Sequence, residues 1–208
     1  MRWITAVICV LAAAMPSAQS KAVAPLNVGD PFPRLEGEFL SGRKAILPDA
    51  AAGKSALVMM GFTYQSRFVV EAWAEPLRAA LAGRAATTFF EVPVLGGMAR
   101  MGKWFIDSGM RRGTPRELHE NVITVWGGVD RWKTLMGFSK TAPDDAYLAL
   151  IGKDGRVRWL YHGPYSAAAL DAMLTEVGPR DVYTKMGPGA WATPKPSTPP
   201  LNPGPRER

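Results

Sequence analysis

The stretch GFTYQSRFVVEAW, residues 61–73, decides the fold because it joins an apolar run to a helical pattern. The preceding run, SALVMM at residues 55–60, is apolar at every position after its serine. Such a run is typical of a central strand in a sheet that is covered on both sides. Apolar side chains then recur at helical spacing, which predicts a helix over residues 67–82 with a kink or restart at Pro76. A thiol at this helix N-terminus would be activated by the helix dipole, but no cysteine stands there.

The only cysteine of the 208 residues, Cys9, lies in a segment typical of a signal peptide. This segment, residues 1–24, has a basic start, an apolar run over residues 3–15 and small residues before Ala24. We expect cleavage after Ala24, with Ala18 as an earlier candidate, and export to the periplasm. If the segment is retained, the protein is membrane-anchored. The cleaved chain would hold no cysteine, which excludes disulfides, thiol nucleophiles and cysteine-ligated metals.

The chain is basic, with a formal charge of +7, and loss of Arg2 and Lys21 with the first 24 residues leaves +5. In a cytosolic protein this charge would suggest nucleic acid. In an exported protein we expect a membrane-protein client or complex subunit as partner, an anionic membrane surface as a further one, and no nucleic acid. A basic surface that is merely solvated is an equally good interpretation.

Strands and helices alternate along residues 26–179, which predicts one α/β domain. The order is an N-terminal hairpin, then β-α-β-α-β-α-β-β-α, ending in an antiparallel pair around Asp154-Gly155. This resembles the thioredoxin-like arrangement, a central sheet flanked by helices. Residues 180–208 are rich in proline and glycine and are expected to form a disordered tail. The predicted segments are a hairpin at 38–48, strands at 55–60, 87–95, 121–126, 146–151 and 156–161, and helices at 67–82, 98–110, 129–136 and 166–177. On the helix at 98–110 we expect one apolar face with Met98, Met101, Trp104 and Phe105, and Arg100, Lys103 and Asp107 on the side that faces water.

No residue pattern supports a metal, a cofactor or catalysis. Residues 61–64 resemble the opening of the Sco-type copper chaperone motif, whose two cysteine positions hold Gln65 and Val69 here. No histidine lies near Asp144-Asp145 in the sequence, where such a motif would need one. Met98 and Met101 could offer two thioethers to Cu(I), but a Met stripe is more often core. His119 and His162 lack ligand spacing, so we predict a protein that is not an enzyme.

Two arginines in the last predicted strand, Arg156 and Arg158, alternate with Val157 and Trp159. Alternation places both guanidinium groups on one face, where they could receive a carboxylate or a phosphate. A solvated edge strand is the alternative interpretation.

The chain resembles the ATP synthase assembly factor ten family, thioredoxin-like proteins that lack the redox cysteines. The resemblance covers about residues 32–163, and its most specific block is Gly155-Arg156-Val157-Arg158-Trp159 after Ala146-Tyr147-Leu148. Further blocks are Phe32-Pro33, residues 56–62, Glu71-x-Trp73-x-Glu75-Pro76-Leu77 and Arg111-Arg112-x-x-Pro115. The resemblance implies a chaperone for a membrane-embedded subunit of the proton channel. The signal-peptide-like start departs from a mitochondrial presequence, which leaves the client in doubt.

We therefore predict a redox-inactive thioredoxin-like assembly factor or chaperone for a membrane energy-transducing complex. The alternative is a degenerate Sco- or TlpA-like protein that delivers a metal or cofactor to a respiratory complex, and an enzyme with an unrecognised site comes last. Core packing is an equally good interpretation for Phe68 and Trp73. The candidate partner-binding residues are Tyr64, Phe68, Trp73, Glu75, Arg112, Arg156, Arg158 and Trp159.

Overall fold

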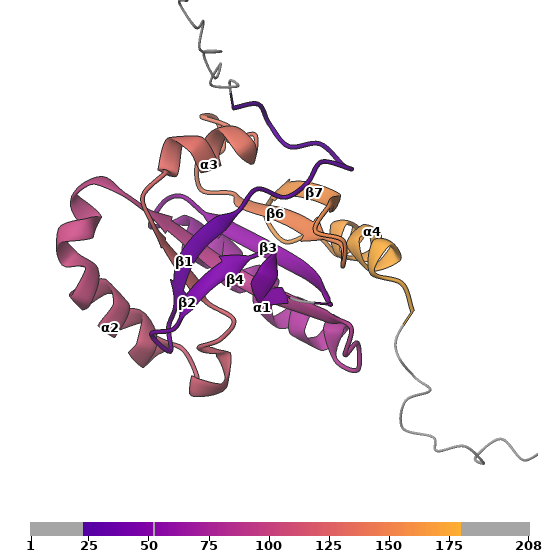
Figure 1. Cartoon of the computed structure of the whole chain (residues 1–208), viewed down its shortest axis with the longest axis horizontal. Coiled ribbons are helices and arrows are strands. Elements are labelled where there is room, and N and C mark those ends of the chain that lie inside the picture. Colours follow the sequence, from indigo (N-terminus) through magenta and orange to yellow (C-terminus); the bar gives the residue numbers. More distant parts are fainter. Residues whose placement is uncertain (1–22, 52, 180–208) are drawn as a thin grey trace, which may run out of the picture.

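The computed structural model describes residues 23–51 and 53–179 (Figure 1). All but the last two residues of the predicted signal peptide, and the whole predicted tail, lie outside the described residues. The elements are β1 (Leu35–Phe39), β2 (Lys44–Leu47), β3 (Ser55–Gly61), α1 (Ser66–Leu81), β4 (Thr87–Leu95), α2 (Lys103–Gly113), β5 (Ile123–Trp126), α3 (Val129–Leu135), β6 (Ala146–Ile151), β7 (Val157–Gly163) and α4 (Ala167–Val177).

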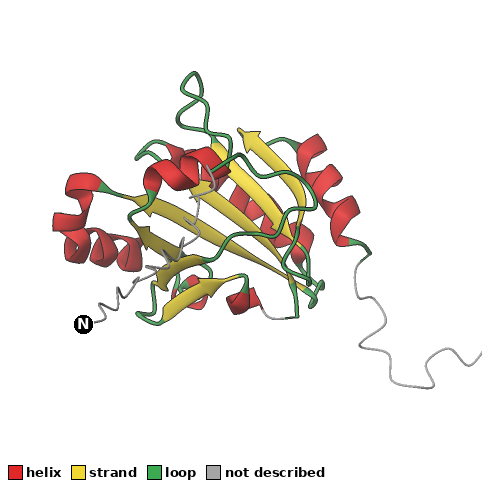
Figure 2. Cartoon of the chain, turned by 45° about the horizontal axis from the view of Figure 1, so that its top comes forward, coloured by secondary structure: helices red, strands yellow, loops and turns green. Residues whose placement is uncertain are grey.

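The strands form one mixed sheet of seven in the order β2-β1-β5-β4-β3-β6-β7. Strand β4 is parallel to both β3 and β5, whereas β6 and β7 continue the sheet antiparallel beyond β3. The predicted N-terminal hairpin is β1–β2, which joins the opposite end of the sheet by antiparallel pairing of β1 with β5. Figure 2 shows helices on both sides of this twisted sheet.

Strand β3 is the centre of the molecule. Ala56, Val58 and Met60 point into one core, which also holds Trp132 and Leu135 at helix α3. Leu57 and Met59 point into the other, beneath helices α1 and α4. All five side chains are fully buried. The sequence-based prediction of a strand covered on both faces is therefore confirmed.

Helix α1 packs on the sheet through one stripe of its surface. Val70, Trp73, Leu77 and Leu81 are buried along it. The helix runs without interruption through Pro76, so the predicted restart there is wrong. On the same sheet face, α4 begins at Ser166, whose hydroxyl accepts a hydrogen bond from the Ala169 amide as the predicted N-cap.

Helix α2 is turned the opposite way to the prediction. Met101, just before α2, and Trp104 and Phe105 within it are 88%, 79% and 70% exposed. Asp107, predicted to face water, is buried at 6% exposure, and Lys103 is half-buried. The prediction that the apolar residues of segment 98–110 form its core face is therefore wrong.

Polar contacts hold α2 against the sheet. The Lys103 ammonium forms ion pairs with Asp107 and with Glu38 of β1, the latter at 3.2 Å, and lies over the Trp126 ring of β5. The Arg111 guanidinium donates a hydrogen bond of 2.7 Å to the Leu40 carbonyl. Because these charged groups take the side toward the sheet, Met101, Trp104 and Phe105 are left exposed. Figure 1 shows α2 at the edge of the molecule.

Among the residues that the structure describes, no helix combines the length and the apolar character that a membrane crossing requires.

The inversion of α2 predicts opposite outcomes for two tryptophans. Trp73→Ala empties a fully buried site and should lower the free energy of unfolding by about 3–5 kcal/mol. Trp104→Ala removes an exposed ring and should change it by no more than about 0.5 kcal/mol. Urea denaturation followed by circular dichroism measures both, and a large loss for Trp104→Ala would mean that α2 packs as first predicted.

Candidate functional site

The candidate site is the β3–α1 turn, residues 61–66, with the first turns of α1. Strand β3 ends at Gly61, and Gln65 occupies the N-cap position of α1, exposed and without a side-chain capping bond. Val69, one turn further, is partly buried against the core beneath α1. The two positions that hold cysteine in the Sco-type motif therefore carry an amide and an aliphatic side chain at the helix N-terminus.

Two hydroxyl side chains fix the turn. Ser66, 1% exposed, donates through Oγ to the Thr63 carbonyl at 2.7 Å and accepts from the Thr63 amide at 3.2 Å. In return, Thr63 Oγ1 accepts from the Ser66 amide at 3.0 Å, which satisfies one free N–H of the helix start. Gly61 is needed beside them, because a Cβ there would lie 2.5 Å from Ser66 Oγ.

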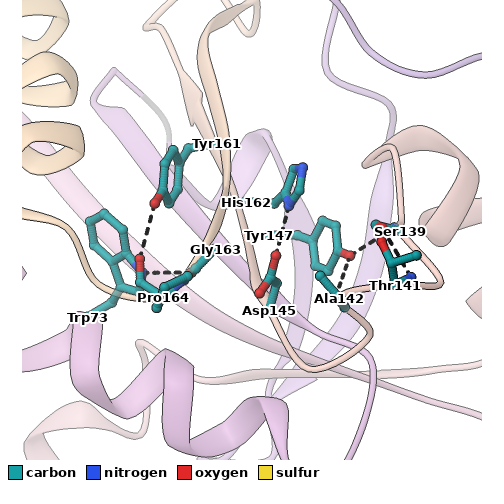
Figure 3. A network of polar contacts seen from close by, with 10 residues as sticks. All are labelled: Trp73, Ser139, Thr141, Ala142, Asp145, Tyr147, Tyr161, His162, Gly163 and Pro164. Carbon is teal, nitrogen blue, oxygen red and sulfur yellow. Dashed lines mark hydrogen bonds and ion pairs between the residues drawn. The ribbon is translucent and has the colours of Figure 1, made fainter.

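Polar contacts connect the turn to the loop before β6 and to β7. Thr63 Oγ1 donates to Asp144 Oδ1 at 2.6 Å, in the loop before β6. The next residue, Asp145, contacts His162 of β7 through Oδ2 and Nδ1 at 2.9 Å (Figure 3). The His162 ring stacks on Tyr147, with ring centroids 5.3 Å apart.

Tyr147 anchors the loop that precedes β6. Its hydroxyl accepts from the Ser139 amide at 3.0 Å and donates to the Ala142 carbonyl at 3.1 Å, as Figure 3 shows. Burial raises the pKa of this phenol, so it stays protonated and able to donate at neutral pH. The loop that faces the β3–α1 turn is therefore held in place by a core tyrosine.

The sequence-based search for a histidine near Asp144-Asp145 missed His162. Antiparallel pairing of β6 with β7 sets Tyr147 opposite His162 and brings the imidazole next to Asp145. Even so, no group of three or more His, Cys, Asp or Glu side chains within the described ranges is placed to hold a metal ion. The Asp145–His162 pair supplies two ligands, fewer than a structural or catalytic zinc site uses.

An exposed aromatic pair flanks the turn. Tyr64 is 70% and Phe68 49% exposed, and the Arg67 guanidinium carbon lies 4.3 Å from both ring centroids. The prediction that Trp73 also belongs to this surface is wrong, because its side chain is fully buried in the core. Its indole N–H donates to the Gly163 carbonyl at 3.3 Å (Figure 3).

A groove runs between α1 and α2, with β4 as its floor. It contains a cavity of about 330 Å³ and an adjoining, more open hollow of about 800 Å³. We call both together the α1–α2 groove. Tyr64 and Arg67 contribute to one wall, and Ile106 and Met110 to the other, in both parts. The sequence analysis did not predict this groove, because it placed the wrong face of α2 toward the core.

Glu91 of β4 lies in the smaller cavity, and sequence reasoning did not single it out. Burial raises its pKa to about 7, although Arg78 opposes the shift and Glu71 adds to it. Its carboxylate makes no hydrogen bond or ion pair with the residues that the structure describes. A lone acidic residue inside the otherwise apolar strand TTFFEVPVL was the only sequence signal for it.

Three predicted binding residues lie far from the groove. The β6–β7 turn adjoins the beginning of β3, whereas the candidate site adjoins its end. There, Arg156 donates to the Gly29 carbonyl at 2.8 Å, and Arg158 pairs with Asp154 at 2.6 Å. Trp159 is partly buried and stacks on Tyr161 at 5.7 Å. Both guanidinium groups are exposed as predicted but are engaged within the chain.

Glu75 and Arg112 complete the predicted set. Glu75 is exposed on α1 and Arg112 in the last turn of α2. Neither lines the α1–α2 groove. The structure thus brings together Tyr64 and Phe68 of the predicted surface, adds Arg67 and Phe105, and leaves the others apart.

The fold as a whole is similar to that of solved structures. A protein from Bacteroides vulgatus assigned as a thiol-disulfide oxidoreductase superposes with a TM-score of 0.51 at 19% identity, over 73% of this chain and 97% of that one. The chain has a thioredoxin-like fold. At this identity the likeness shows the fold alone.

Two further solved structures are similar. One is a protein from Chlorobium tepidum assigned as thiol:disulfide interchange protein DsbE (TM-score 0.49, 19% identity, 74% of this chain and 99% of that one). The other is an exposed lipoprotein thioredoxin from Streptococcus pneumoniae (TM-score 0.47, 17% identity, 69% and 99%). No family model and no curated protein matches the sequence. The resemblance to the ATP synthase assembly factor ten family therefore stays a prediction.

The raised pKa of Glu91 predicts a pH-dependent stability. Between about pH 4.5 and 7 the folded protein holds a proton that the unfolded chain has lost, so the free energy of unfolding falls as the pH rises. In the Glu91→Gln variant the side chain cannot ionise, so the free energy of unfolding should no longer fall with rising pH on its account. We expect the variant to match the wild type at pH 5 and to exceed it by roughly 1–3 kcal/mol at pH 8.

Urea denaturation at pH 5, 6, 7 and 8 measures this difference. Glu75→Gln, an exposed carboxylate on the neighbouring helix, is the matched control and should leave the pH profile unchanged. A profile for Glu91→Gln that runs parallel to that of the wild type would show that Glu91 ionises normally.

Proposed function

We propose that this protein is a redox-inactive thioredoxin-like assembly factor, a chaperone that binds a subunit of a membrane energy-transducing complex such as an ATP synthase. The observation that carries the proposal is the β3–α1 turn. It joins a central strand to a helix in a thioredoxin-like fold, but hydroxyl contacts between Thr63 and Ser66 fix it, and it holds no thiol. Thiol–disulfide exchange needs a thiolate, and Cys9 is the only cysteine of the sequence.

The apolar side chains around the α1–α2 groove support a binding role. Tyr64 and Phe68 are exposed beside one wall, and Phe105 contributes to the other. Met101 and Trp104 are also exposed, but neither lines the groove. Exposed aromatic side chains beside a groove are a signature of protein-binding surfaces.

A membrane-protein client fits the chemistry of this surface. Such a client presents apolar segments before it is assembled, and these need apolar cover in an aqueous compartment. The basic charge of the chain and the predicted export support a role at a membrane surface. The resemblance to the assembly factor family points to the same kind of client.

Capture of the client from detergent-solubilised membranes tests the proposal. The tagged wild-type protein should recover ATP synthase subunits, and Tyr64→Ser with Phe105→Ser should reduce recovery at least tenfold by removing apolar contact from both walls. Val28→Ser, which removes an exposed apolar side chain outside the groove, is the control. Mass spectrometry identifies the captured subunits.

The identity of the captured subunit decides between the two predicted roles. Recovery of cytochrome oxidase subunits instead would favour the alternative, delivery of a metal or cofactor to a respiratory complex. Equal recovery by the wild type and the double variant would show that the groove is not the binding surface.

The absence of a thiol from the β3–α1 turn predicts that the purified protein does not catalyse disulfide reduction. Insulin reduced by dithiothreitol should precipitate at the same rate with and without the protein, since a catalyst of this reaction needs a cysteine that cycles. A thioredoxin is the positive control. Faster precipitation with the protein would contradict its redox inactivity.

A further inference from the structure

The smaller cavity of the α1–α2 groove is apolar except for a few groups. Apolar residues from β3, α1, α2 and the loop before β5 line it, namely Met59, Val70, Ile106, Met110 and Val122. Its volume of about 330 Å³ is in the range of ligand pockets. The cavity opens into the hollow lined by Phe62, Leu95 and Phe105, so an occupant can continue along the groove.

Two glycines of α2 keep the cavity open. Gly109 and Gly113, one helical turn apart, both line it, and a Cβ at either position would meet no atom within 4 Å. A glycine inside a helix destabilises the helix by roughly 0.5–1 kcal/mol relative to an alanine. No neighbouring atom at these two positions is close enough to require a glycine. The glycines therefore leave space rather than avoid a clash.

Two carboxylates line this space, and Glu91 is the more buried one, whereas Glu71 is exposed. Helix α1 supplies Glu71 and Arg78 near the Glu91 carboxylate and Arg67 at the cavity wall, whereas α2, β3 and the loop before β5 line the cavity without a charged side chain. Arg78 is too far away to form an ion pair. A partly buried carboxylate in apolar surroundings is costly unless a cation or hydrogen-bond donor meets it.

We infer that the cavity receives a lysine or arginine side chain of the bound client, with the apolar stem against the cavity walls and the cation on Glu91. A long aliphatic stem that ends in a cation matches apolar walls with the carboxylate of Glu91 inside and that of Glu71 at the exposed side. The charge of Arg67 at the wall opposes a second cation, so the site takes one. The adjoining hollow holds neighbouring apolar residues of the client, which favours a peptide segment over a small metabolite.

This inference rests on the proposed function for its occupant, but the preference of the cavity can be measured without a client. The probe is hexylammonium, with hexanol as its uncharged counterpart, titrated into the ¹⁵N-labelled protein at pH 8. We expect shifts in the amide signals of Glu91, Gly109 and Gly113, and at least tenfold tighter binding of hexylammonium than of hexanol. At pH 5.5 the difference should largely vanish, because most of the Glu91 carboxylate is then protonated.

Three variants make the test specific. Glu91→Gln should abolish the preference for hexylammonium while hexanol binding persists. Gly109→Leu should fill the cavity and weaken both probes, and Glu75→Gln should behave as the wild type. Equal affinity for both probes at pH 8, shifts that map outside the groove, or a preference that survives Glu91→Gln would each overturn the inference.

Client capture separates the two proposals. If Glu91→Gln captures the client as well as the wild type and hexylammonium shows no preference, the inference fails while the proposed function stands. If hexylammonium binds at Glu91 but no membrane subunit is recovered, the cavity retains its cation preference and the proposed function fails.

Discussion

Burial of β3 on both faces is the constraint on which the rest of the structure depends. Its neighbours β4 and β6 satisfy its backbone groups, and its side chains enter two separate cores. A strand of this kind cannot shift its register without exposing one core. The end of β3 therefore places Gly61 against Ser66 in the first turn of α1. The hydrogen bonds between Thr63 and Ser66 hold this turn without a cysteine.

Much of the fold could be predicted from the sequence because its signals are local. The apolar run of β3, the hairpin of β6 and β7 and the Ser166 cap each depend on residues that are neighbours in the chain. For α2 the period was correct and the direction wrong. An amphipathic pattern shows that two faces differ, but Glu38 of a distant strand and the Leu40 carbonyl determine that the charged face points inward.

The candidate site could be predicted only in part, for the same reason. Gln65 and Val69 mark the helix start by position in the sequence, and Tyr64 and Phe68 lie beside it. Glu91, by contrast, lies in a cavity only because α1 and α2 pack around it, and this packing is not visible in the sequence. His162 contacts Asp145 only because β6 and β7 pair. Trp73 was misassigned because a helical aromatic shows no sign in the sequence of whether it packs inward.

The two walls of the groove are held in place by different kinds of interaction. The wall from α1 rests on a large apolar core, whereas α2 is fastened mainly by the ion pairs of Lys103 and the Arg111 hydrogen bond. Charged contacts that are partly exposed are screened by salt and are individually weak. The position of the α2 wall therefore depends on ionic strength, whereas that of the α1 wall depends on the apolar core and does not.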